Sequence, residues 1–111
     1  MNIQITAKKI EIPQEIRDYT KEKLSKLEKF NQKIQSIEAV IKAEERSVVC
    51  ELIIHVDNRE PVVIEVSGDT IQTAVDTAEG KAERQLRKDK EHRDSVRRRA
   101  ATKINEERDM P

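Results

Sequence analysis

Three consecutive segments rich in valine and isoleucine constrain the fold of this chain most strongly. They span residues 36–44, 47–57 and 60–68, and their apolar side chains recur largely at alternate positions, as in half-buried β-strands. The polar runs Glu-Glu-Arg near position 45 and Asp-Asn-Arg from position 57 separate them, and such runs suit hairpin turns. The three segments therefore predict an antiparallel meander.

One strand and one helix are predicted before this meander. Ile3 and Ile5 alternate with polar residues, which predicts a strand over residues 2–7. Residues 14–32 contain no glycine and follow helical spacing, and Pro13 stands where a helix start tolerates its missing N–H.

A second helix is predicted after the meander. Apolar residues recur at helical spacing between Ile71 and Leu86. Either Asp69 or Thr70 can cap this helix, which we expect to run from about residue 70 to the low 90s. Beyond it apolar residues become sparse.

The order β-α-β-β-β-α predicts an α+β fold, with a four-stranded mixed sheet and two helices on one face. A right-handed crossover makes the first two strands parallel, and the two helices then run parallel to each other. We expect one domain over residues 1–95 and a flexible, charged tail over residues 96–111.

The candidate chemistry of the chain is sparse. Cys50 is the only cysteine, and strand parity places Cys50 and His55 on opposite faces of the sheet. No glycine-rich phosphate loop or Ser/His/Asp arrangement is present. We expect no catalytic residue, metal, cofactor or small-molecule substrate. Because no signal peptide or apolar membrane span is evident, we expect a cytoplasmic protein that is a monomer when free and has no membrane partner.

Charge is distributed unevenly along the chain, although the formal net charge is zero. Residues 1–76 hold 11 basic and 14 acidic residues, whereas residues 77–103 hold 10 basic and 5 acidic residues. A basic band late in an otherwise acidic protein is compatible with a nucleic-acid partner. With only two aromatic residues, Tyr19 and Phe30, a base-stacking platform is disfavoured.

Both predicted helices segregate their charges. Lys23, Lys26 and Lys29 form a first basic row, and Lys81, Arg84 and Lys88 form a second basic row. Glu79 and Glu83 lie on the opposite flank of the second helix, with Arg87 as a partner for Glu83. Because the helices are parallel, we expect one basic flank to point between them, so that the two rows frame a groove for a phosphate backbone.

Other interpretations of these charges stay open. Charge-rich helices are often simply solvated, and an acidic protein partner would also fit. Arg97, Arg98 and Arg99 can form a phosphate-contacting arm or a solubilising tail, since acidic residues follow them. A small enzyme is disfavoured because no pocket chemistry is evident.

Several segments resemble the ribosome hibernation-promoting factors, a family that includes the ribosome-associated inhibitor and the sigma-54 modulation proteins. KLSKLEKF at 23–30 is similar to the first helix of this family, and KAERQLRKDKEH at 81–92 is similar to its basic second helix. MNIQITAKKIEI at the start and RRRAAT at 97–102 also fit. The resemblance covers nearly the whole chain.

This resemblance implies a fold similar to a double-stranded-RNA-binding domain with an extra strand. It also implies a stress or stationary-phase factor that inhibits translation by occupying the mRNA and tRNA channel of the small ribosomal subunit. The ribosomal-RNA contacts that it implies are Lys23, Lys26, Lys29, Lys81, Arg84, Arg87, Lys88, Lys90, Arg97 and Arg98. The chain departs from the family where the second helix begins, because Asp69-Thr70-Ile71-Gln72 lacks the usual tyrosine.

Overall fold

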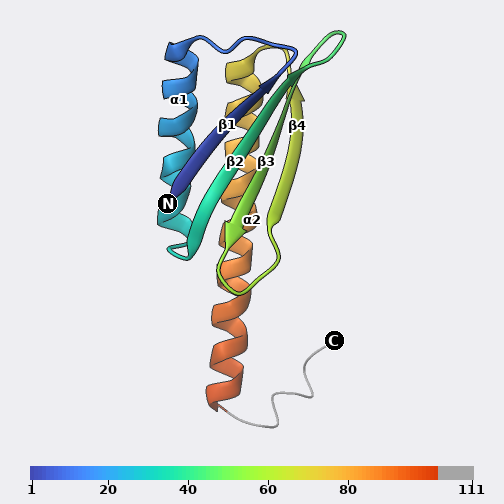
Figure 1. Cartoon of the computed structure of the whole chain (residues 1–111). Helices are drawn as coiled ribbons and strands as arrows, with labels where there is room; N and C mark the ends of the chain where they lie inside the picture. Colours follow the sequence, from blue (N-terminus) through green and yellow to red (C-terminus); the bar gives the residue numbers. More distant parts are fainter. Residues whose placement is uncertain (103–111) are drawn as a thin grey trace.

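The computed structural model describes the backbone of residues 1–102 and the side chains of residues 1–89. The strands and helices follow the predicted order, with a short 3₁₀ helix, η1, added after the first helix (Figure 1). The elements are β1 (Asn2–Lys8), α1 (Gln14–Ser25), η1 (Lys26–Phe30), β2 (Ile34–Ala43), β3 (Val48–Val56), β4 (Val62–Gly68) and α2 (Ile71–Thr102).

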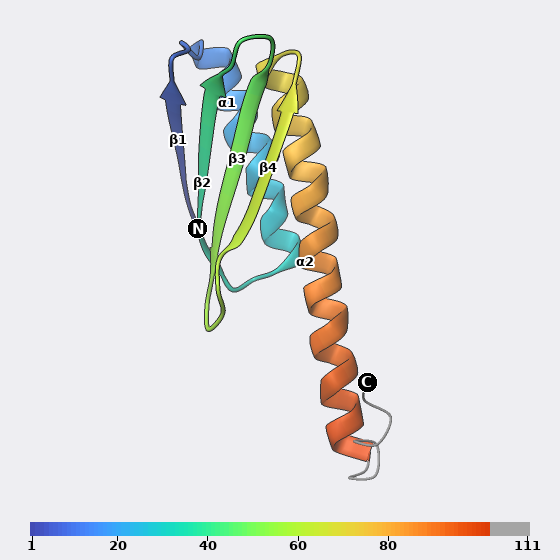
Figure 2. The same cartoon turned by 90° about the vertical axis from the view of Figure 1, so that its right-hand side faces the viewer.

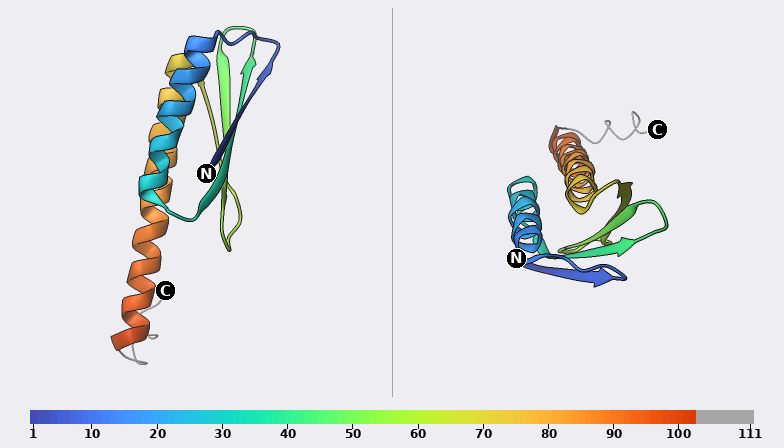
Figure 3. Two further views of the ribbon diagram at one scale, coloured as in Figure 1. Left: turned by 60° about the vertical axis from the view of Figure 1, so that its left-hand side comes forward. Right: turned by 90° about the horizontal axis from the view of Figure 1, so that it is seen from above.

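The strands of the described part form one four-stranded sheet in the order β1-β2-β3-β4. β1 pairs with β2 in parallel, and the other two pairings are antiparallel. Both helices cover the same face of this sheet and run in the same direction (Figures 1 and 3). The predicted α+β architecture is therefore confirmed.

The alternation of β3 decides which face of the sheet forms the core. Cys50, Leu52 and Ile54 are fully buried beneath the helices, and burying side chains of this size contributes roughly 1.5–3 kcal/mol for each leucine or isoleucine. Glu51 and His55 point to the opposite, open face, where they are partly exposed. The predicted separation of Cys50 from His55 is confirmed.

The first helix tightens at its C-terminal end. The α-helical part ends at Ser25, and η1 continues to Phe30 with about three residues per turn. Leu24 and Leu27 are both fully buried, because this tighter turn keeps residues three positions apart on one side. The same geometry aligns Lys26 and Lys29 along the exposed side of η1.

The second helix begins at a threonine cap and extends farther than predicted. The backbone N–H of Thr73 donates to Oγ1 of Thr70 at 3.1 Å, so Thr70 is the cap. α2 reaches Thr102 (Figure 2), about ten residues beyond the low 90s. The expected end was wrong because the apolar stripe determines how far α2 packs, not how far it stays helical. Residues 93–102 include four arginines and two alanines, which favour a helix, and no glycine or proline.

The extra helical turns of α2 include part of the segment that we expected to be a flexible tail. Residues 96–102, which we expected in a flexible segment, are helical, and the proposed boundary at residue 95 falls inside α2. The division into a domain of residues 1–95 and a tail of residues 96–111 stays a prediction.

Candidate functional site

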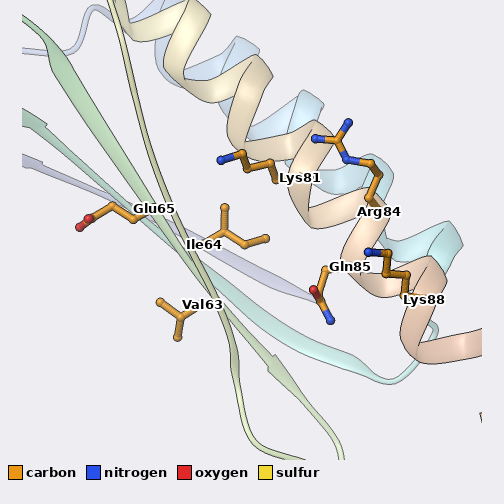
Figure 4. A pocket seen from close by; sticks show the side chains of 7 residues that line it. All are labelled: Val63, Ile64, Glu65, Lys81, Arg84, Gln85 and Lys88. Carbon is orange, nitrogen blue, oxygen red and sulfur yellow. The ribbon is translucent and has the colours of Figure 1, made fainter. Parts of the chain in front are cut away.

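The second basic row lies along the flank of α2 that faces the edge strand β4 (Figure 4). Lys81, Arg84 and Lys88 are all exposed. Within the described part of the chain, none of the three forms an ion pair. Their side chains reach solvent along this flank.

A shallow groove of about 350 Å³ separates this row from β4. Lys81, Arg84, Gln85 and Lys88 line one wall, and residues 63–65 line the other. Ile64 is buried toward the helix, whereas Val63 and Glu65 are exposed. The groove is therefore basic on the helix side and open to solvent.

The first basic row faces α2. Nζ of Lys23 lies 3.9 Å from Oδ1 of Asp76 on α2, and the hydroxyl of Tyr19 donates to the same carboxylate oxygen. Lys23 is half-buried, whereas Lys26 and Lys29 are exposed. At least one member of this row therefore connects the two helices.

Glu79 is a buried carboxylate on the same side of α2, with 8% of its surface exposed. Burial raises the pKa of Glu79, and the neighbouring Glu83 raises it further. Lys23, Lys26 and Lys29 act in the opposite direction and favour the charged carboxylate. The first basic row is thus partly neutralised by acidic residues of α2.

These contacts correct the expected arrangement of the two rows. Lys23 of the first row does point between the helices, but it meets Asp76 on the acidic flank of α2 (Asp76, Glu79 and Glu83) rather than the second row. The second row lies on the other side of α2, against β4. The sequence contained part of the signal for this, because two parallel helices whose basic flanks have the same rotational sense bring the basic flank of one against the opposite flank of the other.

Phe30 ties the end of η1 to α2. Nζ of Lys29 lies 5.3 Å and the guanidinium carbon of Arg87 lies 5.1 Å from the ring centre of Phe30, within the range of cation–π attraction. Arg87 also pairs with Glu83 at 2.9 Å, as predicted from their spacing. Arg87 is therefore held in place by Glu83 and Phe30, and only the contact with Glu83 was predicted from the sequence.

Three predicted site residues cannot be placed at the level of side chains. Lys90, Arg97 and Arg98 lie on the backbone of α2, but their side chains lie outside the described residues. Their proposed contacts stay predictions.

The described residues offer little covalent chemistry. Burial raises the pKa of the Cys50 thiol to about 11, so it is protonated near neutral pH. No group of three His, Cys, Asp or Glu side chains in the described residues could hold a metal ion. No helix in this described part is long and apolar enough to cross a membrane.

Comparison with known proteins places this geometry in a family. The model of the sigma 54 modulation protein / S30EA ribosomal protein family matches residues 3–94. The chain belongs to this family. That membership confirms the resemblance drawn from the two helix motifs, and it spans both basic rows.

Curated relatives in this family carry one name. The ribosome hibernation promoting factor of Pseudomonas putida is 30% identical over 103 residues, which cover 93% of this chain and 100% of the relative. The factor of the same name from Azotobacter vinelandii is 31% identical over 82% of this chain and 84% of its own length. The Escherichia coli K12 factor is 29% identical over 82% of this chain and 95% of its own length.

Solved structures share the fold. A ribosomal subunit interface protein from Coxiella burnetii superposes with a TM-score of 0.75 at 22% identity, covering 81% of this chain and 98% of that chain. The N-terminal domain of Thermus thermophilus Protein Y gives a TM-score of 0.71 at 24% identity, covering 79% of this chain and 98% of that domain.

Proposed function

We propose that this protein is a ribosome hibernation factor of the cytoplasm that binds the small ribosomal subunit and inhibits translation. The observation that carries the proposal is the second basic row, whose three exposed cations have no ion-pair partner within the described residues. Membership of a family whose curated relatives are named ribosome hibernation promoting factors supports it.

The proposed mechanism is occupancy. Lys81, Arg84 and Lys88 neutralise phosphates of ribosomal RNA along one side of α2, and counterions released from the RNA contribute much of the affinity. The body of the domain then fills space in the channel that mRNA and tRNA need. Binding of this kind uses no catalytic residue, cofactor or small-molecule substrate.

The two basic rows have different roles in this proposal. The second row makes the main RNA contacts, because its charges face solvent. Lys26 and Lys29 add contacts from their exposed positions, while Lys23 mainly joins α1 to Asp76. We place Arg87 with the RNA contacts of α2 because its guanidinium is exposed and fixed against Phe30.

Charge reversal tests the proposal. We expect a variant with Lys81→Glu, Arg84→Glu and Lys88→Glu to lose co-sedimentation with small ribosomal subunits, because three attractive phosphate contacts become repulsive. The same variant should no longer inhibit translation in a purified system. Circular dichroism and thermal unfolding should match the parent, since all three side chains are exposed.

A matched control changes the same total charge elsewhere. Lys8, Lys21 and Arg46 are exposed on β1, α1 and the β2–β3 turn, and reversing all three should leave co-sedimentation nearly unchanged. If the second-row variant binds as well as the parent, the proposal is wrong. If ribonuclease treatment of the particles leaves binding intact, an acidic protein partner replaces RNA.

A further inference from the structure

Gly80 is an unexplained feature of α2. It lies well inside a helix that spans Ile71–Thr102. A glycine inside a helix is less favourable than alanine by about 0.5–1 kcal/mol, because glycine loses more backbone freedom than alanine when the chain folds. A glycine inside a helix can serve packing or the close approach of another backbone.

Neither packing nor backbone geometry explains Gly80. A Cβ added at this position would meet no heavy atom of the described residues within 4 Å, apart from the immediate helix backbone. Its φ angle is not positive. Gly68 differs, because a Cβ there would lie 2.9 Å from the backbone nitrogen of Ala74. The missing side chain of Gly80 therefore faces open space.

The surroundings of Gly80 indicate what could fill that space. Helical spacing places Thr77 and Arg84 beside it on one side, and both are exposed. Asp76 and Glu83 are its neighbours on the other side, but each is engaged, Asp76 with Lys23 and Glu83 with Arg87. The cations adjacent to the bare backbone, Lys81 and Arg84, have no such partner in the described part of the chain.

We infer that Gly80 is a point of close approach, where a sugar–phosphate backbone crosses α2. Without a side chain, the strand can lie against the helix backbone while Lys81 and Arg84 contact its phosphates. The hydroxyl of Thr77 is positioned to hydrogen-bond a phosphate or ribose oxygen. The contact surface then extends from the second basic row toward the N-terminus of α2.

This inference rests on the proposed function but makes a separate claim about shape. A side chain added at Gly80 changes no charge, and its Cβ meets no neighbouring atom of the described residues. Any loss of binding must therefore come from a clash with the partner. Charge reversal of the second row tests whether nucleic acid binds at all, so the two experiments can fail independently.

The test measures stability and binding in the same variants. We expect Gly80→Ala to raise the midpoint of thermal unfolding, because alanine is the better helix former. The same change should weaken affinity for purified small ribosomal subunits several-fold. Gly80→Leu should weaken it by roughly tenfold or more, a loss of about 1.4 kcal/mol.

A control separates bulk at Gly80 from a general gain in stability. Gln72 is exposed in the first turn of α2, away from the second row, and Gln72→Ala should leave affinity unchanged. Gly80→Ala and Gly80→Leu variants that bind as tightly as the parent would overturn the inference. A loss of binding with unchanged or improved stability supports it.

Discussion

At the scale of single residues, Glu79 shows how the structure separates the roles of its charges. Its carboxylate is buried against α1, and burial raises its pKa despite three nearby lysines. The desolvation of the charged form therefore outweighs the attraction of the lysines. An acid with a raised pKa in the folded state binds its proton more readily when folded than when unfolded.

The sign of the resulting pH dependence follows from this difference. Folding is favoured by Glu79 at low pH, and that contribution is lost as pH rises through the raised pKa. We expect Glu79→Gln to be more stable than the parent near neutral pH, by up to about 1 kcal/mol. The advantage should disappear on acidification, when the parent carboxyl takes up its proton.

Thermal unfolding of both proteins between about pH 4 and pH 8 checks this expectation. The gap between the two midpoints should widen as pH rises. A parent that is more stable than Glu79→Gln at the alkaline end would show instead that the attraction of Lys23, Lys26 and Lys29 dominates.

At the scale of elements, the junction between β4 and α2 depends on a small residue. Gly68 ends β4, and a Cβ at this position would lie 2.9 Å from the nitrogen and 3.2 Å from the Cα of Ala74. Both contacts are with helix backbone, which cannot move aside as a side chain can.

We therefore expect Gly68→Ala to destabilise the fold by about 1–3 kcal/mol, as overpacking typically does. Urea unfolding measures this loss. Gly80→Ala is the natural comparison, since the same methyl group enters open space and should stabilise. Equal stabilities for the two alanine variants would contradict this account of both glycines.

Most elements could be predicted from the sequence because their signals are local. The alternation of β3 and the apolar stripe between Ile71 and Leu86 each specify one buried face. The apolar stripe could not predict where α2 ends, because the helix continues beyond the stripe to Thr102.

The arrangement of the site was less predictable because it depends on contacts between helices. Each basic row is visible as a spacing of three or four residues. The contacts between the helices depend on how α1 and α2 dock. They include the ion pair of Lys23 with Asp76 and the placement of Phe30 near both Lys29 and Arg87. The position of β4 beside the second row, where it completes the groove, likewise depends on how α2 docks on the sheet.

At the scale of the whole molecule, a net charge of zero conceals an asymmetric surface. The open face of the sheet carries both signs of charge: Glu51 lies directly opposite Glu65 across β3 and β4, and Lys8 lies directly opposite Lys42 across β1 and β2. The exposed cations of the second row lie on the helical side, along α2 (Figure 4). In the proposed complex, the exposed cations of the second row would place α2, and not the open face of the sheet, against ribosomal RNA.

The salt dependence of binding to small ribosomal subunits is the most direct test of the proposed phosphate contacts. A variant with Lys81→Gln, Arg84→Gln and Lys88→Gln removes three phosphate contacts, so the slope of log affinity against log salt should become shallower by about 2–3. Neutralising Lys8, Lys21 and Arg46 in the same way should leave the slope unchanged. A second-row variant with the slope of the parent would show that these cations do not contact phosphates, and would contradict their proposed role in binding the ribosome.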